Sequence, residues 1–231
     1  MPKGMQARGI ARLNKMLSSA VKLFLENGYE KTTTTAIASA AGMSPSSFFA
    51  AFESKEALLL VLVQKMFDAQ FDSAKLMTDE HSDPLMLYCV ETATKIHIAE
   101  LSEPLCEMYV MAYSLPTTSE YIYQNTAKKL EDIFGEYLPE AQNKDFYELE
   151  IASAGVIRGF MARQTDFYFT VEQKLRRCLD CCMTLYNVPA EKRADVISTV
   201  LSMDLRTAAE NIIADITQKA EAGFESAMSR A

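Results

Sequence analysis

The sequence predicts an all-α fold with a small N-terminal head and a larger helical body. Glycine (8) and proline (7) are scarce among 231 residues, whereas Ala, Leu, Met and Glu, which favour helices, are abundant. Apolar residues recur at spacings of three and four along most of the chain, as they do on one face of a helix. We find no convincing strand and no internal repeat.

The N-terminal region reads as a long helix followed by a short one. The first spans residues 8–27 and ends at Asn27-Gly28, because glycine adopts the left-handed conformation of a helix terminus at low cost. A run of threonines follows, and Thr32 or Thr33 is expected to cap a short helix that continues to Ala41.

Gly42 breaks the short helix, and two more helices follow. Ser44 is expected to cap the third helix, with Pro45 in its first turn, where a missing N–H costs nothing. Ser54 is expected to cap a long fourth helix from residue 55 to about residue 76. Two short helices joined by a tight glycine turn form a helix-turn-helix arrangement. We therefore predict a DNA-binding domain over residues 8–68, with its motif at 33–52.

The remainder, residues 69–231, is predicted to be a helical domain for ligand binding and dimerisation. Its expected helices cover residues 84–101, 104–113, 121–138, 144–163, 171–186 and 190–222. The longest apolar runs are too short to span a bilayer, and no secretion signal is visible at the N-terminus. An odd number of cysteines (5) without such a signal favours reduced thiols and a cytoplasmic location.

Charge is distributed unevenly between the two parts. The whole chain carries a formal charge of −8, yet residues 1–60 contain seven basic and four acidic side chains. A basic head on an acidic body lets the head approach phosphates while the body stays away from them.

Several short motifs in the head resemble the TetR (tetracycline-repressor-like) family of transcription regulators. They fall in register over about 50 residues without a gap, and the body resembles the family only in length and helix order. The matching segments are 16–29, Thr32-Thr33, Ile37-Ala38, 41–44, Phe48-Phe49, Phe52 and 54–58.

The resemblance implies a homodimer whose two heads read successive major grooves of a double-stranded DNA operator. It also implies a cavity in each body for a small effector, which we expect to be apolar or aromatic, and repression that the effector relieves. The predicted function is thus a ligand-responsive repressor, without enzymatic activity, cofactor, metal or membrane contact. The alternative is a dimeric small-molecule-binding or interaction protein of the same fold that has lost specific DNA binding.

Contact residues follow from the family pattern, position by position. Those expected at DNA are Thr33, Thr35, Ser44, Pro45, Ser46, Ser47, Phe49 and Lys55. The chain departs from the pattern at Phe49, where the family usually has Tyr, and at Ala50 and Ala51, where it has His or Tyr. The third helix therefore has no Arg, Lys, Asn or Gln for a bidentate base contact. We expect readout led by DNA shape, with Lys3, Arg8, Arg12 and Lys55 supplying much of the affinity.

Two further sets of residues are expected in the body. Flexible Met and amphipathic Tyr side chains can line an adaptable cavity, and the predicted ligand contacts are Tyr88, Thr92, Met108, Tyr109, Tyr113 and Tyr123. Small residues at spacings of three and four allow close helix approach across a two-fold axis. The predicted dimer interface therefore comprises Ala152, Gly155, Val156, Gly159, Leu179 and Met183; the alternative is a contact within one chain.

Two clusters have both a functional and a structural interpretation. Cys178, Cys181 and Cys182 could form a metal or thiol sensor, but buried cysteines on an apolar helix face are the favoured explanation. A set of acidic residues with one histidine could serve catalysis or bind a metal, but a solvated helix face is favoured. This set comprises Glu91, His97, Glu100, Glu103 and Glu107.

Overall fold

The computed structural model describes residues 7–77 and 83–228, and over these ranges it contains helices and no strand. The predicted all-α class is therefore confirmed. No described helix is long and apolar enough to cross a bilayer. Lys3, one of the residues expected to contact DNA, lies outside the described residues.

The head begins with a helix that ends at a left-handed glycine, as predicted. Gly28 has φ +83° and Gly42 has φ +68°, so both turns require a conformation that other residues adopt at a cost. Thr33 caps the second helix by accepting a hydrogen bond from the backbone N–H of Ala36 (3.1 Å). The head helices are α1 (Ala7–Asn27), α2 (Thr34–Ala40), α3 (Pro45–Ala51) and the start of α4 (Lys55–Met77).

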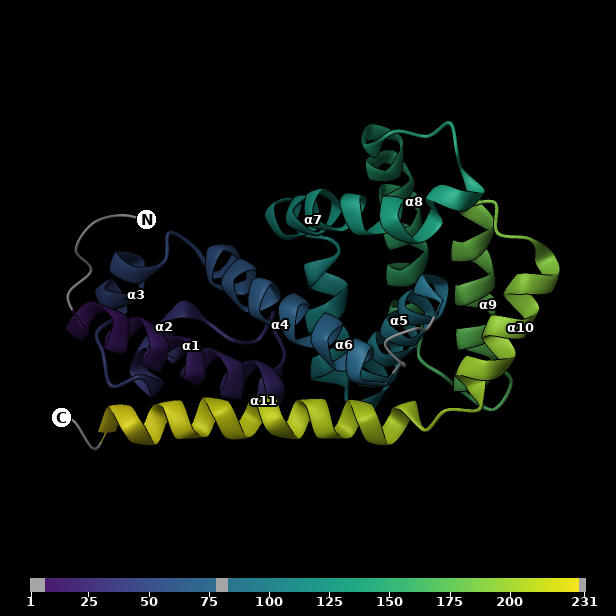
Figure 1. The fold of residues 1–231 in the computed structure, drawn as a ribbon. Coiled ribbons are helices and arrows are strands. Elements are labelled where there is room, and N and C mark those ends of the chain that lie inside the picture. The colour runs from purple at the N-terminus through teal and green to yellow at the C-terminus, as the bar shows by residue number, and fades with distance from the viewer. Residues whose placement is uncertain (1–6, 78–82, 229–231) are drawn as a thin grey trace.

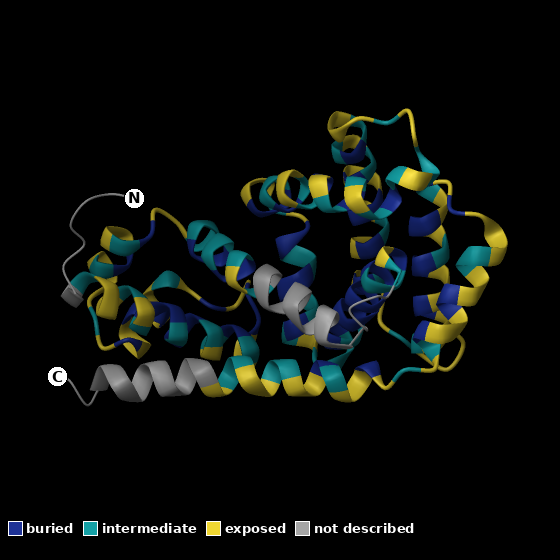
Figure 2. Ribbon diagram, viewed as in Figure 1, coloured by how far each residue is buried: buried dark blue, intermediate teal, exposed yellow. Residues whose placement is uncertain are grey.

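The body packs its helices around a continuous apolar core (Figures 1 and 2). Phe134 and Tyr186 stack with ring centroids 4.1 Å apart, and both are fully buried. The body elements are α5 (Pro84–Leu101), α6 (Glu103–Ala112), α7 (Pro116–Phe134), η1 (Gly135–Tyr137), α8 (Asn143–Ala162), α9 (Val171–Leu185), α10 (Ala190–Leu201) and α11 (Leu205–Met228).

Two predicted helix ranges are wrong. Helix α7 begins at Pro116 rather than at 121, because proline is well tolerated in a first helical turn. The single last helix predicted over 190–222 is two helices, since the chain breaks after Leu201 and restarts at Leu205. Asp204 caps the second of them by accepting a hydrogen bond from the Thr207 N–H (3.2 Å).

Helix α11 extends from the body to the head. It runs along one side of the molecule, packing on α5 in the body and on α1 in the head (Figure 1). The boundary predicted at 68/69 falls inside the continuous helix α4, which also belongs to both parts. Head and body are therefore joined by two long helices as well as by direct contacts.

Candidate functional site

The residues predicted to contact DNA gather around α2 and α3, at the end of the molecule remote from α9 and α10 (Figure 1). Most of them are exposed, because the buried side of these helices is used by Ile37, Ala38 and Phe48. The exposed members are Thr33, Thr35, Ser44, Pro45, Ser46 and Phe49, and Ser47 is half-buried. These residues therefore lie together on one exposed surface of the head.

Chemically this surface is sparse. The Ser44 hydroxyl lies 2.9 Å from that of Ser46 and 3.0 Å from that of Ser47, so the three serines form one hydrogen-bonded group. Phe49 stands beside them with 59% of its surface exposed. Such a surface offers hydroxyls and one apolar ring, which suit phosphate oxygens and a thymine methyl better than bidentate base recognition.

Lys55 is bonded to the turn before α2. Its ammonium donates to the carbonyl oxygens of Tyr29 (2.8 Å) and Thr32 (3.0 Å) and lies 4.1 Å from the centre of the Tyr29 ring. Burial lowers the pKa of Lys55, although the Glu107 and Glu30 carboxylates act in the opposite direction. In this structure the turn before α2 occupies the donors of Lys55, and a contact of Lys55 with a DNA phosphate stays a prediction.

Helix α6 touches the same turn from the body side. The Glu107 carboxylate accepts a hydrogen bond from the backbone N–H of Glu30 (2.6 Å), and a Cβ added at Gly28 would meet it at 2.2 Å. In α4, Glu56 accepts a hydrogen bond from the Thr117 N–H at the start of α7 (2.9 Å). The head is therefore fastened to the body by specific carboxylate contacts.

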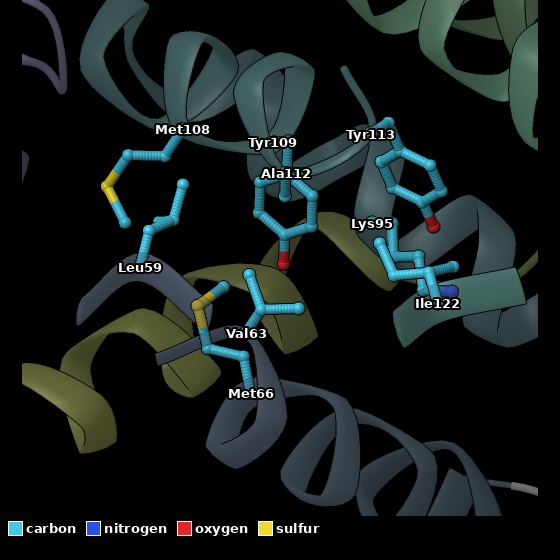
Figure 3. A pocket seen from close by; sticks show the side chains of 9 residues that line it. All are labelled: Leu59, Val63, Met66, Lys95, Met108, Tyr109, Ala112, Tyr113 and Ile122. Atoms are coloured by element: carbon cyan, nitrogen blue, oxygen red, sulfur yellow. The ribbon is translucent and has the colours of Figure 1, made fainter. Parts of the chain in front are cut away.

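A first cavity, the apolar cavity, lies between α4, α5, α6 and α7 (Figure 3). In the close-up the Tyr109 ring points from α6 towards Val63 and Met66 of α4. The volume is about 30 Å³, which is room for one or two water molecules. Its lining residues are Leu59, Val63, Met66, Lys95, Met108, Tyr109, Ala112, Tyr113 and Ile122.

A second cavity, the polar cavity, lies between α5, α7 and α8 and shares Lys95 and Tyr113 with the first. Its volume is about 20 Å³. Three side-chain hydroxyls in its wall, those of Tyr88, Thr92 and Thr126, have no nitrogen or oxygen partner in the described part of the chain. The remaining lining residues are Glu91, Lys129, Leu130, Ile133, Glu150 and Ile157.

Three charged side chains are enclosed at this second cavity. Glu91 and Lys95 form an ion pair of 2.9 Å one helical turn apart. Burial lowers the pKa of Lys95, but the Glu91 carboxylate more than compensates and the pKa lies above its ordinary value. Glu150 accepts a hydrogen bond from the Ser153 hydroxyl (2.7 Å), and burial raises the pKa of Glu150 from 4.5 to about 7.

Five of the six residues predicted to bind ligand line these cavities. Met108 and Tyr109 line the apolar cavity, Tyr88 and Thr92 the polar one, and Tyr113 both. Tyr123 lines neither of them; its ring instead packs edge-on against Tyr147, with centroids 6.2 Å apart. Tyr123 is half-buried against the core outside these two cavities, and its contact with a ligand stays a prediction.

The charged residues of the cavities were not predicted, although the sequence holds a signal for one of them. Phe146, Ser153, Ile157 and Met161 mark the buried face of α8, and Glu150 falls on that face. A lone glutamate within an apolar helical stripe indicates a buried carboxyl. The α4 residues Leu59, Val63 and Met66 read only as core.

The predicted dimer residues divide into two groups. Ala152, Gly155 and Gly159 are exposed on α8 and Val156 is half-exposed, so they remain available to a second chain. Leu179 and Met183 are fully buried within the chain, which excludes them from an interface between copies. Helix α9 uses that side to pack on α5 and α8.

The acidic cluster is not a solvated helix face. Glu91 is buried in the ion pair above, Glu107 binds the head, and Glu100 binds the Thr165 hydroxyl (2.7 Å) and the ammonium of fully buried Lys174. The solvated-face interpretation is wrong for these three, because Glu91 is buried against Lys95 one helical turn away and the carboxylates of Glu100 and Glu107 have partners distant in sequence. In the cysteine cluster, Cys178 and Cys182 are buried and Cys181 is exposed.

Sequence comparison places the head in a known family. Residues 16–62 match the bacterial regulatory proteins of the tetR family. Over 185 residues the chain is 25% identical to YuxN of Bacillus subtilis (strain 168), an uncharacterized HTH-type transcriptional regulator. That match covers 79% of this chain, which spans only 59% of the length of the curated relative.

Two solved structures share the fold, at identities that carry no more than the fold. RolR in complex with the ligand resorcinol has a TM-score of 0.66 at 13% identity, covering 84% of this chain and 96% of RolR. SmeT, the repressor of the Stenotrophomonas maltophilia multidrug efflux pump SmeDEF, has a TM-score of 0.54 at 17% identity, covering 77% of this chain and 91% of SmeT. The helix-turn-helix head, over residues 16–62, is therefore similar to that of the bacterial regulatory proteins of the tetR family.

Proposed function

We propose that the protein is a DNA-binding transcriptional repressor whose body binds a small effector and whose working form is a homodimer. One observation carries the proposal: helix α4 contacts both functional regions. Its residues Leu59, Val63 and Met66 line the apolar cavity, while Lys55 at its start is bonded to the turn before α2.

The size of the cavities defines how an effector would act. Volumes of about 20 and 30 Å³ are far below the roughly 300 Å³ or more of a typical ligand site. An effector therefore enters only when α4 and α6 separate, and the displacement of α4 carries Lys55 and the head with it. Binding then shifts the population towards a second spacing of the two heads.

The similar proteins support this proposal. RolR is solved with resorcinol, an aromatic compound, and SmeT is named as a repressor. An aromatic or apolar effector suits the side chains that line the cavity beside α4. The reading surface, which is the exposed surface of α2 and α3 that is predicted to contact DNA, carries few charged side chains. Such a surface suits recognition by DNA shape.

Titration against the DNA flanking the protein's own gene, by fluorescence anisotropy at two salt concentrations, tests the regulatory function. A repressor binds one fragment far more tightly than random DNA, and its affinity falls steeply with salt. Equal, weak binding to every fragment contradicts the proposal.

The homodimer is proposed on the exposed stripe of α8. Ile151 is 44% exposed there, and Cβ atoms added at Gly155 or Gly159 would meet no atom within 4 Å. The loop after α8 adds two aromatic rings, since Phe167 and Tyr168 are both exposed. Apolar, small-residue surface of this kind is typical of a helical interface between copies.

A charged substitution in the stripe tests the dimer. Gly155→Arg is expected to yield monomers in sedimentation velocity without loss of helical content, because the site is open within the chain. Ser198→Arg, exposed on α10, is the matched control and is expected to leave the mass unchanged. A dimer that persists in Gly155→Arg would place the interface elsewhere.

The second candidate is a dimeric ligand-binding protein of this fold without operator recognition. The observation that favours it is the reading surface itself, where α3 carries serines, alanines and Phe49 but no base-reading cation or amide. The same titration separates the two, because this candidate binds all DNA equally.

A further inference from the structure

The polar cavity contains one more buried carboxyl than buried cation. We propose that it receives the cationic end of the effector, an organic ammonium or amidinium group, while the effector's apolar part occupies the adjoining apolar cavity. This inference rests on the proposed function and names the chemical class of the effector.

The partners of the charged groups provide the first argument. Glu91 and Lys95 satisfy each other in their ion pair. Glu150, almost wholly buried, has a neutral partner, the Ser153 hydroxyl, which also lies 2.9 Å from the Tyr186 hydroxyl. Within the described ranges no salt bridge joins Glu150 to a cation; the Lys95 ammonium attracts the Glu150 carboxylate from farther away but is shared with Glu91, to which it is closely paired. A buried carboxylate without a cation of its own is costly. A cationic ligand supplies the missing charge.

The unpartnered hydroxyls provide the second argument. Thr92 is fully buried and Tyr88 nearly so, and both line the same cavity as Thr126 and Glu150. The three hydroxyls have no nitrogen or oxygen partner among the described residues, and that of Tyr88 has only the Cys182 thiol. A buried polar atom without a partner costs about 1–3 kcal/mol. An ammonium has three N–H donors and an amidinium has four, so one cationic group can satisfy the carboxylate and neighbouring hydroxyls together.

The surroundings of Glu150 agree with this assignment. Burial is the largest cause of its raised pKa; the Ser153 hydrogen bond and the Lys95 ammonium lower the pKa in part, and the Glu91 carboxylate raises it. A bound cation reverses both of the raising effects by stabilising the ionised form. The titratable groups that face this region are Glu91 and Lys95 of α5, Tyr113 at the end of α6, Lys129 of α7, and Cys182 and Tyr186 on α9 and at its end. Lys129 is only half-buried, so solvent screens its charge.

The connection between the two cavities indicates what the rest of the effector is like. Lys95 and Tyr113 line both, so a ligand whose charged end reaches Glu150 extends past them into the apolar cavity. There it meets Leu59, Val63 and Met66 of α4. The effector is therefore an amphipathic cation, and its apolar end contacts the helix that holds the head.

Three probes of matched shape test the assignment on the full chain by isothermal titration calorimetry. They are phenylbutylamine, phenylbutanol and phenylbutyrate, whose ends are cationic, neutral and anionic. The amine is expected to bind at least about tenfold more tightly than the other two. Because Glu150 has a pKa of about 7, amine affinity is expected to rise about tenfold between about pH 6 and about pH 8.

Two variants locate the effect. Glu150→Gln is expected to abolish the preference for the amine over the alcohol, whereas Glu148→Gln, exposed on the same helix, is expected to retain it. If Glu150→Gln fails to fold, the pH dependence of amine affinity in the unaltered chain tests whether Glu150 binds the amine.

The inference is overturned if the amine does not bind, binds no more tightly than the alcohol, or keeps its preference in Glu150→Gln. If phenylbutanol or phenylbutyrate binds instead and causes the protein to release DNA, the proposed cation site is wrong but the proposed regulatory function is supported. An amine that binds as expected to a chain without DNA specificity supports the cation site and contradicts the regulator.

Discussion

The surface of the head around the start of helix α4 differs in character from the two cavities of the body. The head presents three serines, exposed Phe49 and no cation on α3, and Lys55 is occupied by backbone carbonyls. In the body, the polar cavity between α5, α7 and α8 encloses an ion pair, a second carboxyl and three hydroxyls without a nitrogen or oxygen partner among the described residues. Most of the buried charged and polar groups of the two regions therefore lie in the body. If the proposed function is right, selectivity for the effector is expected to exceed selectivity for individual bases.

The largest effect is expected from breaking the ion pair of the polar cavity. Lys95→Met leaves the Glu91 carboxylate buried without its partner, which costs about 3–5 kcal/mol of unfolding free energy. Urea denaturation measures it, with Lys128→Met, exposed on α7, as control. The double variant Lys95→Met with Glu91→Leu is expected to recover most of the loss. A single variant as stable as the parent would show that the pair is solvated.

Next in size is a gain in stability. The folded chain binds the Glu150 proton more tightly than the unfolded chain, so its stability falls as pH rises from about 4.5 to about 7. Glu150→Gln removes this penalty and is expected to add about 2–3 kcal/mol at about pH 8 and less than about 1 kcal/mol at about pH 5. Urea denaturation at both pH values tests it, and a gain independent of pH would contradict burial as its cause.

A smaller effect is expected at the head. Lys55→Ala removes the donor for the carbonyls of Tyr29 and Thr32 and is expected to cost about 1–2 kcal/mol of stability. DNA affinity falls with it, but the dependence of log affinity on log salt is expected to stay unchanged, because no phosphate contact is lost. Lys31→Ala, exposed before α2, is the control. A slope reduced by about one in Lys55→Ala would support the phosphate contact.

The smallest effect is expected on the reading surface. Ser47→Ala removes one hydroxyl from the serine group and is expected to cost less than about 1 kcal/mol of DNA-binding free energy. Its signature is altered sequence preference in a competition assay with mutated operators, with stability unchanged. A loss of several kcal/mol would show that the surface reads bases more directly than its composition indicates.

Local rules made the head predictable. Gly28, Gly42, Thr33 and Ser54 act on neighbouring residues only, and the helices begin and end where these residues place them. The pattern of α3 likewise revealed a surface without base-reading side chains. Each of these features depends on residues within one or two turns of chain.

Residues whose partners are distant in sequence escaped prediction. Lys55 meets carbonyls 23 and 26 residues away, and Lys174 meets Glu100 across 74 residues. A charged side chain reads as solvated unless such a partner is known. Glu91 and Lys95 escaped prediction for a different reason: they are close in sequence, and their spacing of four is equally common on exposed helix faces.

Helix α11 determines which motions remain open to the head. Because it packs on α5 in the body and on α1 in the head, it restrains the head relative to the body, as α4 also does. A head that tilted about α4 alone would pull α1 away from α11 and expose apolar surface. Sliding of α1 along α11 would preserve that contact, so any movement of the head that the proposed effector causes is expected to be a translation along α11 rather than a free rotation.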